Sequence, residues 1–568
     1  MAIRMPPQRY MLSAILLLLF IIVSYQFRPE GPFEKVGAWY SILPPITAIL
    51  LAYATRQLLW SLGLAVLVGG YLTIIQHDYS VMSSLGQGVV KGVGYGFSVV
   101  SDPWSLKILG FVIMILMMIS IIIVAGGLTA IANRLQKYAQ TRRSTKLVTA
   151  MMGLLVFIDD YANTMIVGSS MRPLSDKQKI SREKLAFIVD ATSAPVAGLA
   201  VVSTWIGYET GLFGKTAETL GINRDACAMF FDALPFRFYC ILMLCFVFIN
   251  LWSRRDFGPM LVAERRAQLE NKILADNAVP MTSRSFTVNE ADVSARIRMK
   301  TALIPFMTLF GTLLCGIWLD GGGLQKEDLA VINPFAWLEV ISSTKNSSLI
   351  LLLSSSAGLV VALLCARIIA KAELRLILLA AYSGLRSSVL PMLILILAWS
   401  LKSSCDDLNT GEYLVATIGQ VLSPIWFPAL LFMAAALTSF GTGTSWGTMA
   451  ILIPTSIPVA YMLDGGQYGL ITMISLGAVL DGSIFGDHCS PISDTTIMSS
   501  IASSCDHLHH VKTQVPYSLS VAGIALLAGY LPVASGMPAG LALLAGIILL
   551  LLISKLAGKT TVQSISNG

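Results

Sequence analysis

Charged side chains are scarce in this sequence. Only 12% of its 568 residues are Asp, Glu, Lys or Arg, whereas 55% are hydrophobic. A soluble domain carries about a quarter charged residues, so a large soluble enzyme is excluded. The charges that remain cluster between long apolar runs, which indicates a protein that crosses a membrane repeatedly. The net charge of +7 needs no nucleic-acid partner, because basic loops orient membrane proteins.

The eight cysteines lack any metal-binding or disulfide spacing. Four of them lie in or beside apolar segments, where a thiol acts as a small hydrophobic side chain. Cys227 and Cys405 fall in predicted outer loops, and the sequence leaves open whether they pair. No nucleophile with a neighbouring base is recognisable. We therefore expect no enzyme activity, no cofactor and no metal other than a transported sodium ion.

Apolar segments long enough to cross a bilayer, at about 1.5 Å per residue, recur along the chain. They lie near residues 10–25, 39–55, 57–75, 105–126, 185–207, 235–252, 299–319, 348–366, 376–400, 466–485, 515–533 and 536–554. The first resembles a signal peptide but lacks a clean small-x-small cleavage site, so we interpret it as a span. The pattern predicts an all-α polytopic membrane protein with about 12 transmembrane helices.

Positive charge predicts the orientation of these spans. Residues 133–146 and the linker 253–298 are rich in Lys and Arg, which places both on the cytoplasmic side. Threading the remaining spans between them puts both termini in the cytoplasm. The expected location is the inner (plasma) membrane. The linker mixes charges of both signs and has few aromatic residues, which is typical of a solvated connector.

Two further apolar segments are interrupted by polar residues. Segment 147–171 has basic loops on both sides, so a re-entrant hairpin that turns at "FIDDYAN" (157–163) satisfies the charge rule better than one pass. Segment 424–463 turns at "SFGTGTSWGT" (439–448), and its flanks carry acids but no Lys or Arg. This second hairpin is therefore predicted to enter from the opposite side.

Each hairpin precedes a broken helix, near 185–207 ("DATSAPVAG") and 466–505 ("DGSIFGDHCSPISDTT"). Opposite-facing halves with broken helices are the architecture of secondary transporters, so we predict an inverted repeat. The predicted divisions are N-terminal helices (1–132), a first repeat core (133–252), the linker (253–298), scaffold helices (299–400), a second repeat core (401–510) and C-terminal helices with a tail (511–568).

Carboxylates at the bilayer centre are costly, so acids there are candidate functional residues. Those in the first hairpin turn and the helix breaks are Asp159, Asp160, Asp190, Asp481, Asp487 and Asp494. Pro491 disfavours a continuous helix between Asp487 and Asp494, which predicts two half-helices meeting in an unwound crossing. The hydroxyls there belong to Ser490, Ser493, Thr495 and Thr496. Such oxygens suit sodium, and one acid that binds either sodium or a proton would couple the two ions.

Alternative interpretations accompany each of these residues. The acids could cap helices, above all Asp159 and Asp160, or pair with a basic residue such as Arg386. A site for a substrate or an ion at the hairpin tips would use Asp159, Asp160, Asn163, Thr442, Thr444 and Ser445. The small residues of the second tip suit an anion or carboxylate at a half-helix start, or simply close packing.

His488 could sense pH or be a hydrogen-bonded core residue. "CDHLHHVK" (505–512) is expected to be a polar collar rather than a metal site.

Three stretches resemble the NhaC-type sodium/proton antiporter family of the ion transporter superfamily. They are "FGDHCSPISDTTIMSS" (485–500), "GTGTSWGTMAILIP" (441–454) and "ILAWSL" (396–401). The resemblance implies that Asp487, Ser490, Ser493, Asp494 and Thr495 line the ion site and that the tip 442–448 opposes it. Some members have lysine where this chain has His488. The family also includes exchangers of organic acids.

We therefore expect a secondary active transporter that exchanges sodium for protons by alternating access, with a shared carboxylate ion site. A sodium- or proton-coupled carrier of a small organic acid or amino acid is the alternative, and a channel or membrane sensor is a third reading. The expected partners are the lipid bilayer, sodium ions and protons. A small carboxylate or amino acid and a homodimer remain open, and no nucleic acid is expected.

Overall fold

The computed structural model describes residues 38–55, 57–75, 81–281, 298–326, 333–418 and 423–560. In this part of the chain, 10 helices are long and apolar enough to cross a membrane, or up to 12 if each of two bent pairs counts as one span. The prediction of an all-α polytopic membrane protein is confirmed. The predicted first span, residues 10–25, lies outside the described residues.

The long apolar helices are spread along the whole described chain. They are α3 (Leu58–Ile75), α5 (Pro103–Val124), α15 (Lys300–Asp320), α17 (Ser347–Ile368), α18 (Leu374–Asp407), α20 (Phe427–Thr442), α21 (Ser445–Leu463), α22 (Leu470–Cys489), α24 (His507–Ile524) and α26 (Ala539–Leu556). The 3-10 helix η6 (Pro424–Trp426) leads into α20, and the π-helical η7 (Ala525–Tyr530) and α25 (Leu531–Ala534) extend α24.

The remaining elements are shorter, less apolar or bent. They are η1 (Trp39–Ile42), α2 (Leu43–Thr55), α4 (Val81–Ser101), α6 (Gly127–Gln136), α7 (Arg142–Leu155), α8 (Asp160–Lys177), α9 (Arg182–Ala191), α10 (Ala194–Leu199), α11 (Thr204–Leu220), α12 (Ala226–Ala233), η2 (Leu234–Phe236), α13 (Phe238–Ser253), α14 (Gly258–Leu269), η4 (Gly323–Gln325), α16 (Pro334–Ser343), α19 (Thr410–Ile418) and α23 (Asp494–Ser503). The two-residue strands β1 (Arg255–Asp256) and β2 (Lys559–Thr560) pair antiparallel.

Helix α4 has no counterpart among the predicted spans. Its sequence alternates glycine and serine with valine, so its hydropathy is too low to stand out. The glycines serve close packing on α3 instead: a Cβ added at Gly70 would lie 2.4 Å from the carbonyl oxygen of Gly88. The close helix–helix contact that results is the small-residue packing common in membrane bundles.

Both predicted hairpin turns are helix breaks in the structure. The chain leaves α7 at Val156 and starts α8 at Asp160, and it leaves α20 at Gly443 and starts α21 at Ser445. Helices α7 and α8 pack on each other, as do α20 and α21. The positions of the turns agree with the sequence analysis, while re-entrance and the inverted repeat stay predictions.

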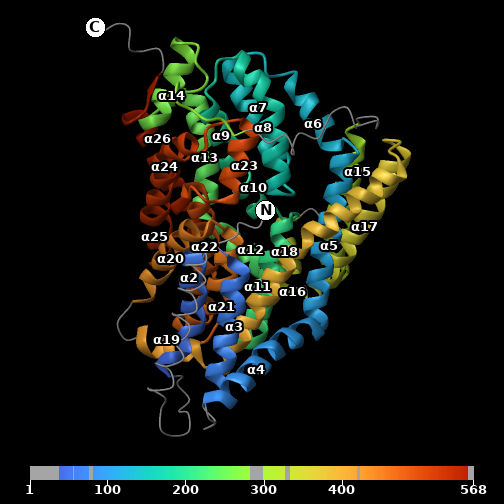
Figure 1. The fold of residues 1–568 in the computed structure, drawn as a ribbon, viewed down its shortest axis with the longest axis vertical. Helices are drawn as coiled ribbons and strands as arrows, with labels where there is room; N and C mark the ends of the chain where they lie inside the picture. The colour runs from blue at the N-terminus through green and yellow to red at the C-terminus, as the bar shows by residue number, and fades with distance from the viewer. Residues whose placement is uncertain are drawn as a thin grey trace.

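The broken helices bring the two halves of the chain together. The α9–α10 segment is bent by 48° from α11, with the chain irregular at residues 200–203, and α22 is separated from α23 around Pro491. Helix α23, late in the sequence, packs against the early helices α8 and α9. In Figure 1 these helices lie between α24 and α26 on one side and α5, α15 and α17 on the other.

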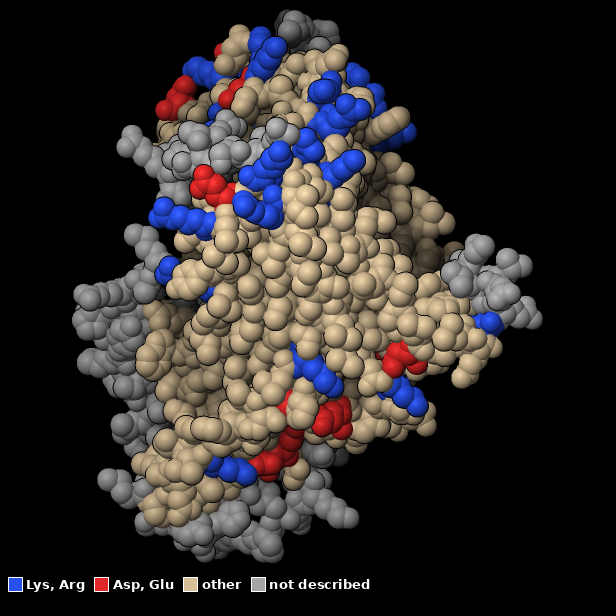
Figure 2. All heavy atoms as spheres, turned by 90° about the vertical axis from the view of Figure 1, so that its right-hand side faces the viewer, with Lys and Arg blue, Asp and Glu red and all other residues tan. Residues whose placement is uncertain are grey.

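Lysines and arginines gather at one end of the molecule, which we call the basic end, as Figure 2 shows. Helix α14 folds there. Residues 253–281 of the predicted solvated connector are thus partly structured: Met260 and Glu264 are fully buried, and β1 binds the C-terminal β2. Residues 282–297 lie outside the described residues. Cys227 and Cys405 are both free thiols.

Glu264 fastens α14 to the first hairpin. Its carboxylate lies 2.9 Å from Arg142 and 3.1 Å from Lys146 on α7, and it accepts hydrogen bonds of 3.0 Å from the backbone N–H and the hydroxyl of Ser181 before α9. Burial favours the neutral acid, but the positive charges of Lys146 and Arg142 outweigh it and hold the pKa of Glu264 well below its usual range.

Glu264→Gln is expected to lower the free energy of unfolding at pH 7 by roughly 3 kcal/mol, because it leaves buried basic groups without their counter-charge. A carboxyl whose pKa falls on folding stabilises the folded state above its ordinary pKa, here 4.5, and loses that contribution as the pH falls further. The difference in Tm between variant and wild type should therefore shrink between pH 5 and pH 3.

The control is Asp276→Asn, which removes an exposed partner of Lys272 at the same end of the molecule. Exposed ion pairs contribute little, so its Tm should equal that of the wild type. A Glu264→Gln difference that stays constant down to pH 3 would show that the carboxylate charge is not what stabilises this cluster.

Candidate functional site

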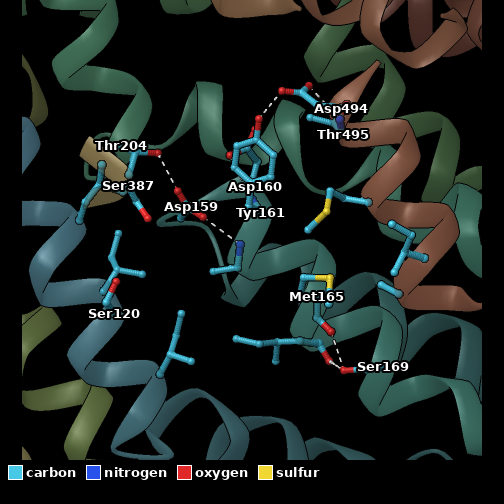
Figure 3. A pocket seen from close by; sticks show the side chains of 18 of the residues that line it. Ser120, Asp159, Asp160, Tyr161, Met165, Ser169, Thr204, Ser387, Asp494 and Thr495 are labelled. Carbon is cyan, nitrogen blue, oxygen red and sulfur yellow. Dashed lines mark hydrogen bonds between the residues drawn. The ribbon is translucent and has the colours of Figure 1, made fainter. Parts of the chain in front are cut away.

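A large cavity opens between the two halves of the chain. Its volume is about 1580 Å³, and its wall is built from α5, α8, α18, α23 and the ends of α11 and α21. Three carboxylates line it: Asp159, Asp160 and Asp494. Figure 3 shows that the first two come from the start of α8, whereas Asp494 faces them from α23. Residues more than 300 positions apart in the sequence therefore share one wall.

The acids of the first hairpin sit at a helix start. Asp159 precedes α8, and its carboxylate accepts the backbone N–H of Ala162 at 2.8 Å, so it is the cap that the sequence analysis kept as an alternative. It also accepts the hydroxyl of Thr204 at 3.3 Å. Asp160 follows directly and is 2% exposed. Capping thus holds Asp159 in place while leaving it on the cavity wall.

Asp494 connects the halves through one hydrogen bond. The hydroxyl of Tyr161 donates to its carboxylate, as the dashed line in Figure 3 shows. The backbone N–H of Thr495 also donates to it, at 2.9 Å, and Thr495 lines the cavity beside it. Ser493 caps α23 and so orients both residues.

Asp487 lies behind this wall. One of its carboxylate oxygens accepts the N–H of Ser445 at 3.3 Å, and the other is buried with no hydrogen-bond partner among the described residues. Ser445 itself lines the cavity. The tip of the second hairpin therefore lies beside both Asp487 and the cavity, while its part in an ion site stays a prediction.

The tip and the break meet in close backbone contact. Gly443 has a left-handed conformation (φ 71°), and a Cβ there would lie 2.6 Å from the carbonyl oxygen of Ile492. Only glycine satisfies both conditions. The hydroxyl of Ser490 donates to the carbonyl of Phe440 at 2.8 Å and closes the same contact. Ser490 is thus a structural tie, and Ser493 is a helix cap.

Asp487, Ser490, Ser493 and His488 do not line the cavity, and neither do four further predicted site residues. Asp481 accepts 2.8 Å hydrogen bonds from Arg237 and Tyr530 and another from the backbone of Tyr239, so it is neutralised elsewhere in the bundle. The other three side chains also have hydrogen-bond partners away from the cavity. Asp190 accepts hydrogen bonds from Ser499 and Gln514. Asn163 donates to the carbonyls of Gly153 and Thr192, and Thr442 donates to the carbonyl of Thr438 within its own helix.

Arg237 is the ion-pair partner of Asp481, and the sequence did not predict this pair. It interrupts an apolar run between η2 and α13, is fully buried, and contacts both Asp481 and Glu209, the latter at 3.4 Å. A lone arginine inside a predicted span is a signal for such a pair. Arg386, which the sequence suggested as a partner, lines the cavity with Arg172 instead.

His488 is fully buried, and its Nδ1 lies 2.8 Å from the hydroxyl of Tyr239. Its Nε2 has no hydrogen-bond partner among the described residues. The ion pairs of the described residues likewise give none of Asp159, Asp160, Asp487 and Asp494 a Lys, Arg or His partner. Among the described residues, the acids at the cavity therefore form no ion pair with a basic side chain.

Comparison with known proteins gives one matching family. A model of the Na+/H+ antiporter family matches residues 196–532. An uncharacterized protein of Haemophilus influenzae is 27% identical over 501 residues, covering 88% of this chain and 92% of that protein. The Na+/H+ antiporter NhaC of Alkalihalophilus pseudofirmus is 30% identical over 133 residues, covering 23% and 28%. The malate-2H+/Na+-lactate antiporter of Bacillus subtilis is 32% identical over 100 residues, covering 18% and 20%.

Two solved structures share the fold. The YdaH transporter of Alcanivorax borkumensis has a TM-score of 0.54 at 15% identity, covering 79% of this chain and 90% of its own. MtrF of Neisseria gonorrhoeae, described within a class of antimetabolite efflux pumps, has a TM-score of 0.50 at 14% identity, covering 97% and 95%. At these identities the likeness concerns the arrangement of helices alone.

Arg237→Gln is expected to destabilise the protein by about 3 to 5 kcal/mol, because removing one partner of a buried ion pair leaves Asp481 uncompensated. Arg386→Gln is the matched control, since the Arg386 side chain is exposed at the cavity. Thermal melting of the purified proteins in detergent measures both. Equal melting temperatures for the two variants would contradict the assigned role of Arg237.

Proposed function

This chain belongs to the Na+/H+ antiporter family, and from that premise we propose that it exchanges sodium ions for protons across the inner membrane. The observation that carries the proposal is the meeting of Asp159, Asp160 and Asp494 at one cavity, with no ion-pair partner in the part of the chain that the structure describes. Carboxylates that share one cavity wall inside a membrane-spanning bundle are costly to keep charged together unless a cation binds them. The cation they take is either a proton or a metal ion.

Sodium fits the oxygen groups that this wall presents. A hard cation binds carboxylate, hydroxyl and carbonyl oxygens. In the proposal Asp494, with the hydroxyl of Thr495, holds sodium from the α23 side, and Asp159 and Asp160 hold it from the α8 side. Asp487 lies behind Ser445 and completes the acid cluster. Asp190 and Asp481, with their existing partners, are not among the ion ligands.

Exchange follows when both ions compete for the same carboxylates. Sodium binding displaces protons from the acids, and protonation releases sodium, so neither ion occupies the site while the other holds it. Alternating access would expose this loaded site to each side in turn. The helix breaks that directly precede α8 and α23, next to Asp159 and Asp494, are the places where the backbone can change conformation without breaking a continuous helix. On the positive-inside rule, we propose that the basic end faces the cytoplasm.

A second candidate is supported by the size of the cavity. Its volume of about 1580 Å³ exceeds the 300 to 1,000 Å³ typical of small-molecule sites and is far more than sodium needs. Arg172 and Arg386 line it and would suit a carboxylate. A carrier that couples sodium or protons to a small organic acid or amino acid would use the same acid cluster.

Purified protein in proteoliposomes separates these candidates. With a pH-sensitive dye inside and a sodium gradient imposed, exchange of sodium for protons predicts proton movement that needs sodium and no organic solute. Proton movement that begins only after a carboxylate or amino acid is added would establish the second candidate in its place. Ion movement with no counter-ion requirement would overturn both and establish a channel.

Asp494→Asn is expected to reduce sodium-dependent proton movement to the level of empty liposomes, because the amide cannot exchange a proton for sodium. Asp276→Asn makes the same change at an exposed surface position and should transport at the wild-type rate. Size-exclusion profiles and melting temperatures confirm that both variants fold. Wild-type transport by Asp494→Asn would remove this residue from the site.

A further inference from the structure

Two histidines of the stretch 505–512 meet at one serine. The Nδ1 atoms of His507 and His510 each lie 3.0 Å from the hydroxyl oxygen of Ser500 on α23. His510 and Ser500 are fully buried, while His507 is partly exposed and follows Asp506, whose carboxylate accepts the backbone N–H of Val279 after α14. The cluster plays no part in the acid site described above, so its chemistry needs a separate explanation.

The far side of each imidazole fixes where its proton lies. Nε2 of His507 is 2.7 Å from the carbonyl oxygen of Pro491, and a carbonyl only accepts, so this nitrogen carries hydrogen. Nε2 of His510 is 2.9 Å from the side-chain oxygen of Gln514. The amide nitrogen of Gln514 donates to the carbonyl of His488 at 3.0 Å, which fixes the orientation of that amide. Nε2 of His510 therefore carries hydrogen as well.

Proton counting then leaves the centre of the cluster one proton short. If both histidines are neutral, both Nδ1 atoms are acceptors, and the single hydroxyl proton of Ser500 can satisfy only one of them. The carbonyl of Thr496, 2.8 Å from the same hydroxyl, is a third acceptor. One added proton resolves this: an imidazolium at His507 donates to the Ser500 oxygen, and the Ser500 hydroxyl donates to His510.

We propose that His507, Ser500 and His510 form a proton relay between the basic end and Asp190. The inference rests on the proposed function, in that protons are one of the two exchanged ions. In the relay step the N–H bond at His507 Nδ1 breaks as an O–H bond forms at Ser500. The original O–H bond of Ser500 breaks as an N–H bond forms at His510 Nδ1, which moves one positive charge inward with no net change in bonds.

Asp190 is the inner end of the relay. Its carboxylate lies 3.9 Å from Nε2 of His510 and accepts a 2.5 Å hydrogen bond from Gln514. A small rotation of the imidazole from Gln514 towards Asp190 would deliver the proton. The hydroxyl of Thr496 lies 3.3 Å from Asp190 and 2.9 Å from the carbonyl oxygen of Asp487, so the relay ends beside the acid cluster.

Charged and titratable groups surround the relay, and besides Arg266 on α14, which pairs with Glu183, and Tyr239 on α13, they come from α8, α9, α22 and the start of α24. They are Asp190, Glu183 and Arg182 on α9, Arg172 on α8, Asp487 and His488 on α22, and Asp506 and His509 next to His507. The arginines donate to carbonyl and hydroxyl oxygens at the end of α23, which leaves the carboxylate of Asp190 as the nearest negative group to His510.

The test compares two reactions of the full-length protein in proteoliposomes. Sodium–proton exchange needs the relay, whereas exchange of radioactive sodium for unlabelled sodium needs only the ion site. Ser500→Ala removes the bridging hydroxyl and should slow sodium–proton exchange by about tenfold or more. Its sodium–sodium exchange should stay within about twofold of wild type.

Ser503→Ala is the matched control, because it removes a buried hydroxyl from the same helix that has no hydrogen-bond partner among the described residues. Both of its exchange rates should equal those of wild type. If Ser500→Ala does not fold, His510→Gln provides the same test, since glutamine keeps polar contacts but cannot relay a proton.

The outcomes separate the relay from the exchange itself. Wild-type protein that moves no protons with sodium would overturn the proposed function and leave the relay without a role. Active wild type with unchanged sodium–proton exchange in Ser500→Ala and His510→Gln would overturn the relay alone. An equal loss of both exchange reactions in Ser500→Ala would show a structural role and would also overturn it.

Discussion

A carboxylate inside a membrane-spanning bundle needs a compensating charge, a set of donors or a bound cation, and much of this structure depends on how each acid meets that need. Asp481 has the guanidinium of Arg237. Asp190 has the donors Ser499 and Gln514. Asp494 has one tyrosine hydroxyl and a backbone N–H, and it faces a cavity. The first two are held in place by the protein, whereas the third is, in our proposal, neutralised by an ion from solution.

Helix breaks make this distribution of acids achievable. A continuous helix satisfies its own backbone groups and offers none to a neighbour, whereas each break frees N–H and carbonyl groups at a chosen depth. Here the freed groups are used at once: the N–H of Ser445 binds Asp487, and the carbonyl of Phe440 binds Ser490. The unwound residues thereby hold the tip of the second hairpin against the helix break that follows it, beside the cavity.

The sequence predicted the breaks well, because Pro491 and the runs of acids and hydroxyls are local signals. It also predicted that the protein crosses a membrane, because long apolar segments are a local signal too. It did not predict that Asp481 is ion-paired, since Arg237 lies 244 residues away in the chain and only the fold brings them together. Helix α4 escaped notice because glycines that pack closely also lower hydropathy. Long-range contacts decide which acids face the cavity and which are buried among other side chains. The periodicity of the sequence does not report such contacts.

The Glu264 cluster also has a mechanical consequence. One carboxylate holds α14, the start of α7 and the residue before α9 at the same time, and β1 adds the C-terminal strand to this group. Elements joined by a shared buried ion cannot slide separately without exposing it. We therefore expect the first hairpin and the helix that follows it to move as one rigid body. The connector between the halves of the chain is part of that body, so a force on the connector would be transmitted to the hairpin.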